Sequence, residues 1–328
     1  MRAAVLTAYG TPLQIREIPD PTPGPGEVLV RVMASGVNPL DIKIRRGEAA
    51  HAKVAPPAIL GIDMAGVVEA VGAQVDQFRV GDEVFGMTGG VGGVAGSLAE
   101  LAAVDARLIA HKPTALSMKQ GAALPLGFIT SWEGLVDRAD VAAGQQVLIH
   151  GGAGGVGFLA VQIALSRGAQ VFATGGPSSQ EAIRQVGATP IDYTTRAVEE
   201  YVDEYTGGEG FDVIVDNVGG DTLDASFAAV KRYTGHVVSA LGWGTHSLAR
   251  LSFRGATYSG VFTLMPLLTG RGREHHGHIM SQAAMLAESG RLVPRLDSRT
   301  FTLDEVNDAH KIFERGSVTG KVAVLPNS

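Results

Sequence analysis

The sequence predicts an α/β protein in which a doubly wound parallel sheet is inserted into a β-rich module. Three observations support this fold class: short strands fill the first third of the chain, strands and helices alternate after about residue 120, and the last segment mixes helices with extended runs. The 328 residues suffice for two domains, since a domain has roughly 100–200 residues. We place the β-rich module in residues 1–119 and 263–328 and the parallel sheet in residues 120–262.

Composition excludes several other classes of protein. Hydrophobic residues make up 45% and charged residues 18%, which is enough apolar material for folded cores. The formal net charge is −6 and Lys and Arg form no stripe, so we expect neither a nucleic-acid partner nor a membrane surface. With 0 cysteines the chain has no disulfides or thiolate metal ligands, which fits a cytoplasmic location.

The first third predicts strands separated by glycine and proline turns. The run Glu27–Ser35 alternates apolar and polar residues, and Pro19–Gly26 before it forms a rigid connector. Short strands at this spacing indicate an antiparallel, partly barrel-like module. The predicted strands are Met1–Leu6, Leu13–Glu17, Glu27–Ser35, Ala65–Val71 and Asp82–Phe85.

The middle of the chain alternates strands with helices, which predicts a parallel sheet covered on both faces. The strands are Val147–His150, Gln170–Thr174, Thr189–Asp192, Asp212–Asp216, His236–Ala240 and Thr257–Phe262. The helices between them are Gly155–Arg167, Ser179–Val186, Arg196–Tyr205 and Asp221–Lys231. In the tail, Ser281–Ser289 and Asp304–Arg315 are predicted helices, and Arg299–Leu303 and Lys321–Leu325 are extended.

A glycine-rich turn follows the first strand of this sheet. Gly152, Gly154 and Gly157 fit the pattern G-x-G-x-x-G, with Gly155 and Val156 inside it. Such a turn lets the backbone approach a pyrophosphate without a Cβ in the way, and the following helix offers free N–H groups. The strand, turn and helix together predict a dinucleotide-binding Rossmann domain. The alternative is a structural turn that binds no ligand.

The end of the second strand favours NADP over NAD. An acidic residue there would bind the 2′-hydroxyl of NAD, and none precedes Glu181. Hydroxyl groups that can donate to a phosphate are present instead, on Thr174, Ser178 and Ser179, with Gly175 between them. The alternative is that these residues form a turn and an N-cap for the next helix.

The chain resembles the medium-chain dehydrogenase/reductase superfamily, and within it the zinc-free quinone oxidoreductase, or zeta-crystallin-like, branch. The resemblance rests on these motifs: Gly36–Asp41, Gly61–Val68, Gly81–Val84, Gly151–Gly157, Asp216–Gly220 and Thr319–Lys321. It implies that the β-rich module is a GroES-like catalytic domain. It also implies a homodimer, formed through the strand near Thr257–Phe262.

The resemblance implies that the protein has no catalytic zinc. Zinc-dependent members carry Cys at the position of Asn38 and His at the position of Ile62, and Asp41 and Asp63 would be a poor zinc set. The cluster His275, His276 and His278 invites a metal interpretation, but no cysteine supports it, so we predict a solvated loop there.

The implied function is hydride transfer from NADPH, or NADH, to a quinone or an α,β-unsaturated carbonyl compound. The negative charge left on the carbonyl oxygen must then be met by hydrogen-bond donors or a cation. Two alternatives stay open: an alcohol dehydrogenase-type enzyme of the same superfamily, and a non-catalytic NADP-binding protein.

The resemblance also assigns site residues. Asn38 is expected to face the cofactor and substrate, and Thr130 to lie beside the nicotinamide. Lys43 stands where some relatives have Tyr, and its ammonium group can donate to the oxyanion. Each has an alternative interpretation: Asn38 as a turn-forming residue before a proline, Lys43 as a solvated lysine, and Thr130 as a helix-capping or helix-internal hydroxyl. Further cofactor contacts are implied for Tyr193, Asn217, Leu241, Gly242, Val261 and Phe262. A lysine that often contacts the 2′-phosphate in relatives has no match here, and the glycine-rich loop at 86–96 is either a lid or a flexible hairpin.

Overall fold

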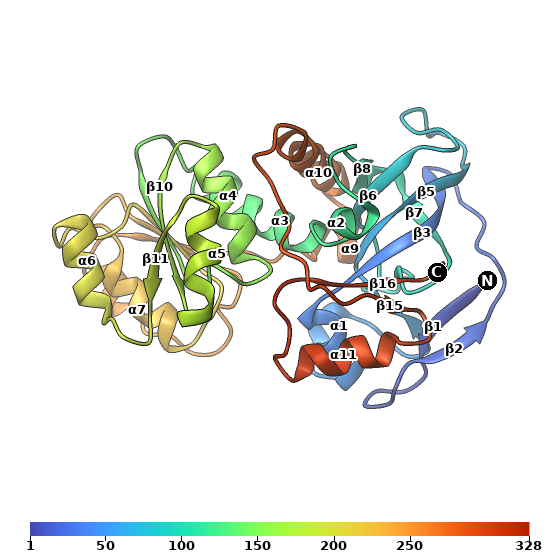
Figure 1. The fold of residues 1–328 in the computed structure, drawn as a ribbon, viewed down its shortest axis with the longest axis horizontal. Helices are drawn as coiled ribbons and strands as arrows, with labels where there is room; N and C mark the ends of the chain where they lie inside the picture. Colours follow the sequence, from blue (N-terminus) through green and yellow to red (C-terminus); the bar gives the residue numbers. More distant parts are fainter. Residues whose placement is uncertain (328) are drawn as a thin grey trace. The chain divides into compact units, whose positions relative to one another are not determined.

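The computed structural model describes residues 1–327 and divides into two compact units. Unit 1 combines Met1–Leu126 with the segment that begins at Leu264, and unit 2 is Gly127–Thr263 (Figure 1). The first boundary follows residue 126 and not residue 119, because helix α2 (Met118–Ala122) packs against strands of unit 1.

Unit 2 contains a six-stranded parallel sheet with helices on both faces (Figure 1). Its strand order is β11-β10-β9-β12-β13-β14. The order runs outward from β9 in both directions, so the topological switch point lies between β9 and β12, as in doubly wound dinucleotide-binding folds. The predicted fold class is confirmed. The strands are β9 (Gln146–Ile149), β10 (Gln170–Gly175), β11 (Thr189–Asp192), β12 (Val213–Asp216), β13 (His236–Ser239) and β14 (Thr257–Gly260).

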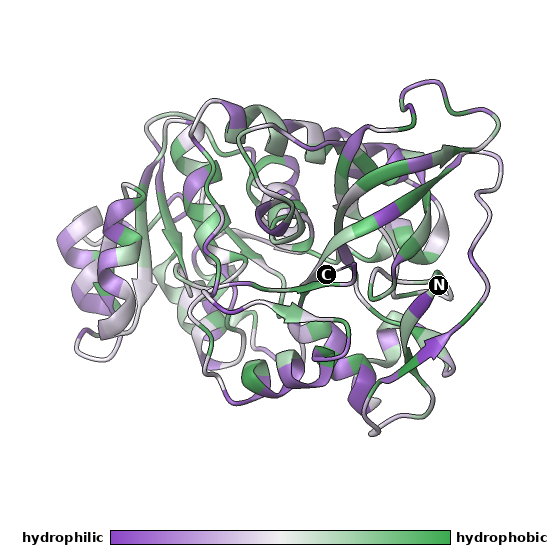
Figure 2. Cartoon of the chain, turned by 45° about the vertical axis from the view of Figure 1, so that its right-hand side comes forward, coloured by the Kyte–Doolittle hydropathy of each residue, from purple (hydrophilic) through white to green (hydrophobic). Residues whose placement is uncertain are grey.

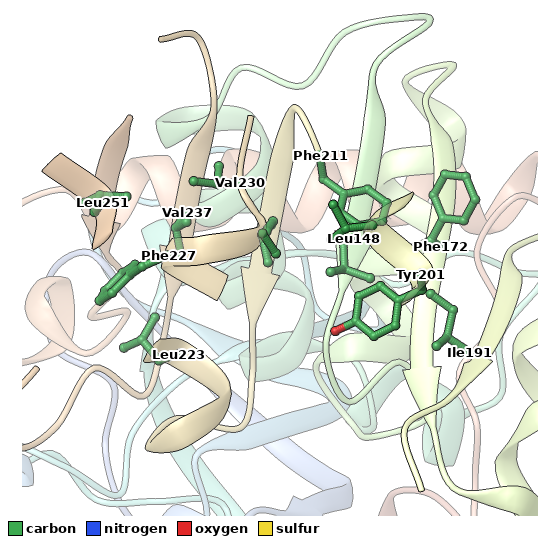
Figure 3. Close-up of a cluster of buried hydrophobic side chains, with 13 residues drawn as sticks. Leu148, Phe172, Ile191, Tyr201, Phe211, Leu223, Phe227, Val230, Val237 and Leu251 are labelled. Carbon is green, nitrogen blue, oxygen red and sulfur yellow. The ribbon is translucent and has the colours of Figure 1, made fainter. Parts of the chain in front are cut away.

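A buried hydrophobic cluster holds one face of this sheet to its helices (Figure 3). Phe172 of β10 lies 5.4 Å from Phe211 between ring centroids, and Tyr201 and Phe227 reach the cluster from α6 and α7. Aromatic side chains bury large areas, so this cluster fixes the strand ends that carry the loops. The helices are α4 (Gly157–Ser166), α5 (Gln180–Gln185), α6 (Val198–Thr206), α7 (Asp221–Ala229) and α8 (Ala249–Ser252).

Unit 1 is β-rich and mainly antiparallel, as predicted. A three-stranded sheet has the order β2-β1-β4, and a seven-stranded sheet has the order β15-β16-β3-β5-β6-β8 with β7 also paired to β3. Alternate residues of β3 point into its core, because the side chains of a strand alternate between faces. The strands are β1 (Arg2–Leu6), β2 (Gln14–Glu17), β3 (Glu27–Val37), β4 (Ala58–Ile59), β5 (Asp63–Val71), β6 (Glu83–Met87), β7 (Leu101–Asp105), β8 (Ile109–His111), β15 (Phe301–Thr302) and β16 (Val322–Leu325).

The helices of the tail correct one prediction. Helix α10 (Arg273–Glu288) begins eight residues before the predicted start at Ser281, so His275, His276 and His278 lie on a helix and not in a solvated loop. His276 is buried, which the charged neighbours along the sequence concealed. Helix α11 (Val306–Glu314) follows, and α9 (Met265–Thr269) precedes α10.

Hydropathy follows this architecture. In Figure 2 the strands of the six-stranded and seven-stranded sheets are mostly hydrophobic, whereas helices at the surface carry hydrophilic residues. No helix among residues 1–327 combines the length and the apolar character needed to span a membrane.

Candidate active site

The glycine-rich turn connects β9 to α4 and has no room for a Cβ at Gly152 or Gly157. A Cβ on Gly157 would lie 2.2 Å from the carbonyl oxygen of Gly151, and one on Gly152 would lie 2.5 Å from the Cβ of Ala173. Gly151 has a φ of +69°, a conformation that glycine adopts without strain. The sequence pattern therefore reflects a steric requirement of the turn.

Helix α3 (Pro125–Trp132) packs against this turn. The hydroxyl of Ser131 donates to the carbonyl of Val156 at 3.0 Å, and a Cβ on Gly127 would lie 2.8 Å from the carbonyl oxygen of Gly155. The turn is thus held from outside as well as by its own glycines. Helix α3 was not predicted from the sequence, because its apolar run shows little helical periodicity.

Thr174 supports the turn from the neighbouring strand. Its buried hydroxyl lies 3.2 Å from the backbone nitrogen of Gly151 and 3.2 Å from Nδ1 of His150. Because these contacts turn the Thr174 hydroxyl toward the protein, the geometry does not favour the expected hydrogen bond from Thr174 to a phosphate. Burial lowers the pKa of His150 to about 4, so its ring is neutral.

The hydroxyls beyond β10 are accessible. Ser179 occupies the N-cap position of α5 without a side-chain hydrogen bond to the helix, and across residues 1–327 neither Ser178 nor Ser179 uses its hydroxyl in one. The turn of the alternative interpretation is therefore formed, through a hydrogen bond from the backbone of Ser179 to the carbonyl of Gly176 at 2.9 Å, but its side-chain capping bond is not. Tyr193 is 63% exposed, and its hydroxyl lies 3.9 Å from where a Cβ on Gly176 would stand. The side chains of Ser179 and Tyr193 thus border Gly175 and Gly176, and Ser178 is exposed beside them in the sequence.

The loop after β12 is fixed by hydrogen bonds that cross the switch point. Nδ2 of Asn217 donates to the carbonyl of His150 at 3.1 Å, while its Oδ1 is buried and has no partner within the described chain. Asp216 accepts hydrogen bonds from the backbone of Gly219 and from the hydroxyl of Ser239. Asn217 therefore offers an unused acceptor at the edge where dinucleotides bind.

The remaining predicted cofactor residues follow β13 and β14. The backbone of Leu241 donates to the hydroxyl of Ser239 at 3.0 Å, and Gly242 lies against the hydroxyl of Tyr258. Val261 is buried, and the ring of Phe262 meets Trp243 edge-on at 6.3 Å. All predicted cofactor residues therefore gather at the carboxyl edge of one sheet.

Thr130 belongs to a chain of hydroxyls in unit 2. Its Oγ1 lies 3.1 Å from Oγ1 of Thr263, which donates to the carboxylate of Glu133 at 3.1 Å. Glu133 begins a π-helical segment, η3 (Glu133–Arg138), directly after α3. Thr130 was predicted from the sequence, whereas Thr263 and Glu133 were not.

Asn38 of unit 1 lies in a buried polar cluster. Its Nδ2 donates to Asp63 at 2.9 Å, and its Oδ1 accepts a hydrogen bond from Lys321. Lys321 also contacts Asp63 at 3.2 Å, with exposures of 7% and 0% for the two side chains. Both ends of the Asn38 amide are thus engaged. Sequence analysis missed the role of Lys321, although a lone lysine ahead of an apolar strand was a visible signal.

Asp41 adds a titratable group to this cluster. It accepts hydrogen bonds from the backbone of Asn38 at 2.8 Å and of Gly61 at 3.2 Å. Burial raises its pKa to about 7, and the nearby charge of Asp63 adds to the rise while Lys321 opposes it.

We expect the stability of unit 1 to fall as the pH rises. The pKa of folded Asp41 lies above its ordinary value of 3.8, so the protonated form favours the folded state. This contribution is complete below that ordinary value and is lost as the pH rises through about 7. Urea unfolding at about pH 5 and about pH 8 measures it. Asp41→Asn should flatten the slope between them, and an unchanged slope would contradict the assignment.

Lys43 lies on α1 (Pro39–Arg46), and its side chain is exposed. This exposure agrees with the alternative prediction that Lys43 is a solvated lysine, and it leaves the ammonium group accessible. Within residues 1–327, no group of three or more His, Asp or Glu side chains is placed to hold a metal ion.

Two protein families match the chain. Residues 24–114 match the alcohol dehydrogenase GroES-like domain, and residues 186–324 match zinc-binding dehydrogenase. The human quinone oxidoreductase is 32% identical over 99% of this chain and 98% of its own length. The 2-methylene-furan-3-one reductase of Solanum lycopersicum is 34% identical over 92% of this chain and 72% of its own.

A longer relative and a solved structure extend these matches. The spectinabilin polyketide synthase protein NorB of Streptomyces orinoci is 35% identical over 92% of this chain, which spans 13% of NorB. The crystal structure of an alcohol dehydrogenase superfamily protein from Novosphingobium aromaticivorans superposes with a TM-score of 0.98, at 56% identity over 100% of both chains.

Proposed function

The chain belongs to the quinone oxidoreductase branch of the medium-chain dehydrogenase/reductase superfamily, and we propose that it reduces a quinone or an α,β-unsaturated carbonyl compound with NADPH. The cofactor part of this proposal depends on one observation, the glycine turn at the switch point, where a Cβ on Gly152 would collide with the neighbouring strand and a Cβ on Gly157 with the backbone of the turn itself. When bound, NADPH supplies the hydride.

The residues present fit a dinucleotide. The turn from Gly152 to Gly157 would hold the pyrophosphate at the N-terminus of α4, a helix of ten residues. The Oδ1 of Asn217, which has no partner within the described chain, would accept a hydrogen bond from a ribose hydroxyl. The hydroxyls of Ser178, Ser179 and Tyr193 would donate to the 2′-phosphate of NADPH. The loops with Leu241, Gly242, Val261 and Phe262 would border the nicotinamide half.

We expect a lower KM for NADPH than for NADH. The hydroxyls beyond β10 suit a phosphate, and a carboxylate among them would repel it. Ser179→Asp should therefore reverse the preference, with a loss of about tenfold or more for NADPH. Ser317→Asp adds the same charge at an exposed serine of unit 1 and should change neither KM. Steady-state kinetics with both cofactors measures this, and a wild-type preference for NADH would contradict the assignment of the hydroxyls.

The reduced carbonyl oxygen needs hydrogen-bond donors. Asn38 and Lys43 are our candidates in unit 1. The amide of Asn38 is already engaged by Asp63 and Lys321, so a role toward substrate would need one of these bonds to be exchanged. The exposed ammonium group of Lys43 needs no such exchange.

The test of the function is NADPH oxidation with a panel of quinones, enones and enoyl thioesters in the presence of a chelator. Turnover of these acceptors, without turnover of saturated aldehydes or alcohols, supports the proposal. Alcohol oxidation that requires added zinc would favour an alcohol dehydrogenase-type enzyme. Tight NADPH binding without turnover of any acceptor would favour a non-catalytic protein.

We also propose a homodimer that acts in the cytoplasm. Strand β14 is an edge of the parallel sheet, and an edge strand has unpaired backbone groups that a second copy can pair with about a two-fold axis. Sedimentation equilibrium tests the stoichiometry, and a monomer at micromolar concentration would contradict it.

A further inference from the structure

We propose that Lys321 is a catalytic residue, whose ammonium group donates a hydrogen bond to the substrate oxygen on which hydride transfer leaves negative charge. This inference rests on the proposed function, because it names the cation that meets the charge formed in that reaction. All of the contacts that support it lie within unit 1.

The ammonium group of Lys321 has a donor that the fold does not use. A lysine ammonium has three N–H donors and no acceptor. Its two acceptors among residues 1–327 are Oδ1 of Asn38 and Oδ2 of Asp63 outside its own backbone, so at least one N–H has no partner in this part of the chain. A buried donor without a partner has an energetic cost, which a ligand with an acceptor oxygen would remove.

The sheet fixes the position of Lys321. Strand β16 begins at the next residue, and its register pairs Val322 with Val37 of β3, so Lys321 stands opposite Asn38. The backbone nitrogen of Lys321 also donates to the carbonyl of Arg295 at 2.8 Å. The ammonium group is therefore held in place by the fold and by two hydrogen bonds before any substrate binds.

Of the two charged side chains in this contact, only that of Lys321 is open to a ligand. It keeps 7% of its surface exposed, whereas that of Asp63 keeps 0%. Asn38, the other partner of the ammonium group, is the residue expected to face the cofactor and substrate. A substrate oxygen that reaches Asn38 would therefore lie beside the ammonium group as well.

Burial makes this ammonium group more effective than an exposed one. When the hydride adds to the conjugated carbon, the displaced electron pair comes to rest on the carbonyl oxygen, and a proton from solvent later completes the reduction. A cation fixed in advance, in a medium of low dielectric constant, stabilises that oxyanion without having to reorient. The side chain of Lys43 is exposed, so water screens its charge. Lys321 therefore suits an oxyanion better than Lys43 does.

The kinetic test uses the fastest acceptor of the panel. Lys321→Met should lower the single-turnover rate of NADPH oxidation about 100-fold, the effect of removing one donor to an oxyanion. The affinity for NADPH should not change, because the cofactor residues lie in unit 2. Lys311→Met removes an exposed lysine of unit 1 and should keep the wild-type rate. Adding Asp63→Asn to Lys321→Met removes the uncompensated charge, and the rate should stay low.

A binding measurement tests the oxyanion site without turnover. In the complex with NADPH, bound 4-nitrophenol should ionise at a lower pH than free 4-nitrophenol, which the absorbance of the phenolate reports. Lys321→Met should abolish this shift. A shift that persists in Lys321→Met, or a rate that recovers in the double variant, would overturn the proposal. A shift that depends on Lys321, without turnover of any acceptor by the wild-type protein, would refute the reductase function and support the oxyanion site.

Discussion

The Gly157→Ala variant is expected to bind NADPH about 100-fold more weakly than the wild-type protein. The added Cβ would stand 2.2 Å from the carbonyl oxygen of Gly151, so one side of the turn must move. A 100-fold loss corresponds to about 2.8 kcal/mol, which is comparable to losing one or two hydrogen bonds to a charged group. Isothermal titration with NADPH measures it.

The same substitution should lower the free energy of unfolding by about 1–3 kcal/mol, since overpacking a tight contact has costs in this range. Gly260→Ala is the matched control. A Cβ there would meet only the hydroxyl of Tyr258, at an ordinary contact distance of 3.8 Å, so the free energy of unfolding should not change. Undiminished NADPH affinity in Gly157→Ala would show that the turn serves the fold alone.

Local signals made this turn predictable from the sequence. A strand, a glycine pattern and a helix follow one another within residues 147–167, and each constrains the next through backbone sterics. The alternation of strands and helices that surrounds the turn predicted the parallel sheet for the same reason. The helix at Pro39–Arg46 had a local signal too, an N-cap Asn38 followed by proline, but no helix was predicted there and a turn at Asn38 was considered only as an alternative.

Contacts between distant residues could not be predicted in this way. Asn38 and Lys321 are 283 positions apart, and Thr130 and Thr263 are 133 apart. No periodicity within either segment indicates that they meet, because the tertiary fold alone brings them together. The orientation of the Thr174 side chain could not be predicted from the sequence either. Its place at the end of a strand suggested a ligand contact, but which way its hydroxyl points depends on Gly151 and His150.

The buried cluster of unit 1 leads to the second large prediction. Lys321→Met should lower the free energy of unfolding by about 3–5 kcal/mol, because removing one partner of a buried ion pair leaves the other charge without compensation. Asp63 is fully buried, and Asn38 would lose the donor to its Oδ1 in the same step. Urea denaturation followed by circular dichroism measures the change.

Two further variants separate charge from packing. Lys311→Met removes a lysine from an exposed pair with Asp308, whose side chains are 59% and 62% accessible, and should change stability by less than about 0.5 kcal/mol. Adding Asp63→Asn to Lys321→Met removes the uncompensated charge and should recover part of the loss, since a neutral amide can still accept from Leu126 and contact Asn38. If the double variant is no more stable than Lys321→Met, then the lysine stabilises unit 1 through the packing of its aliphatic chain, and the charge of Asp63 is compensated by its hydrogen bonds alone.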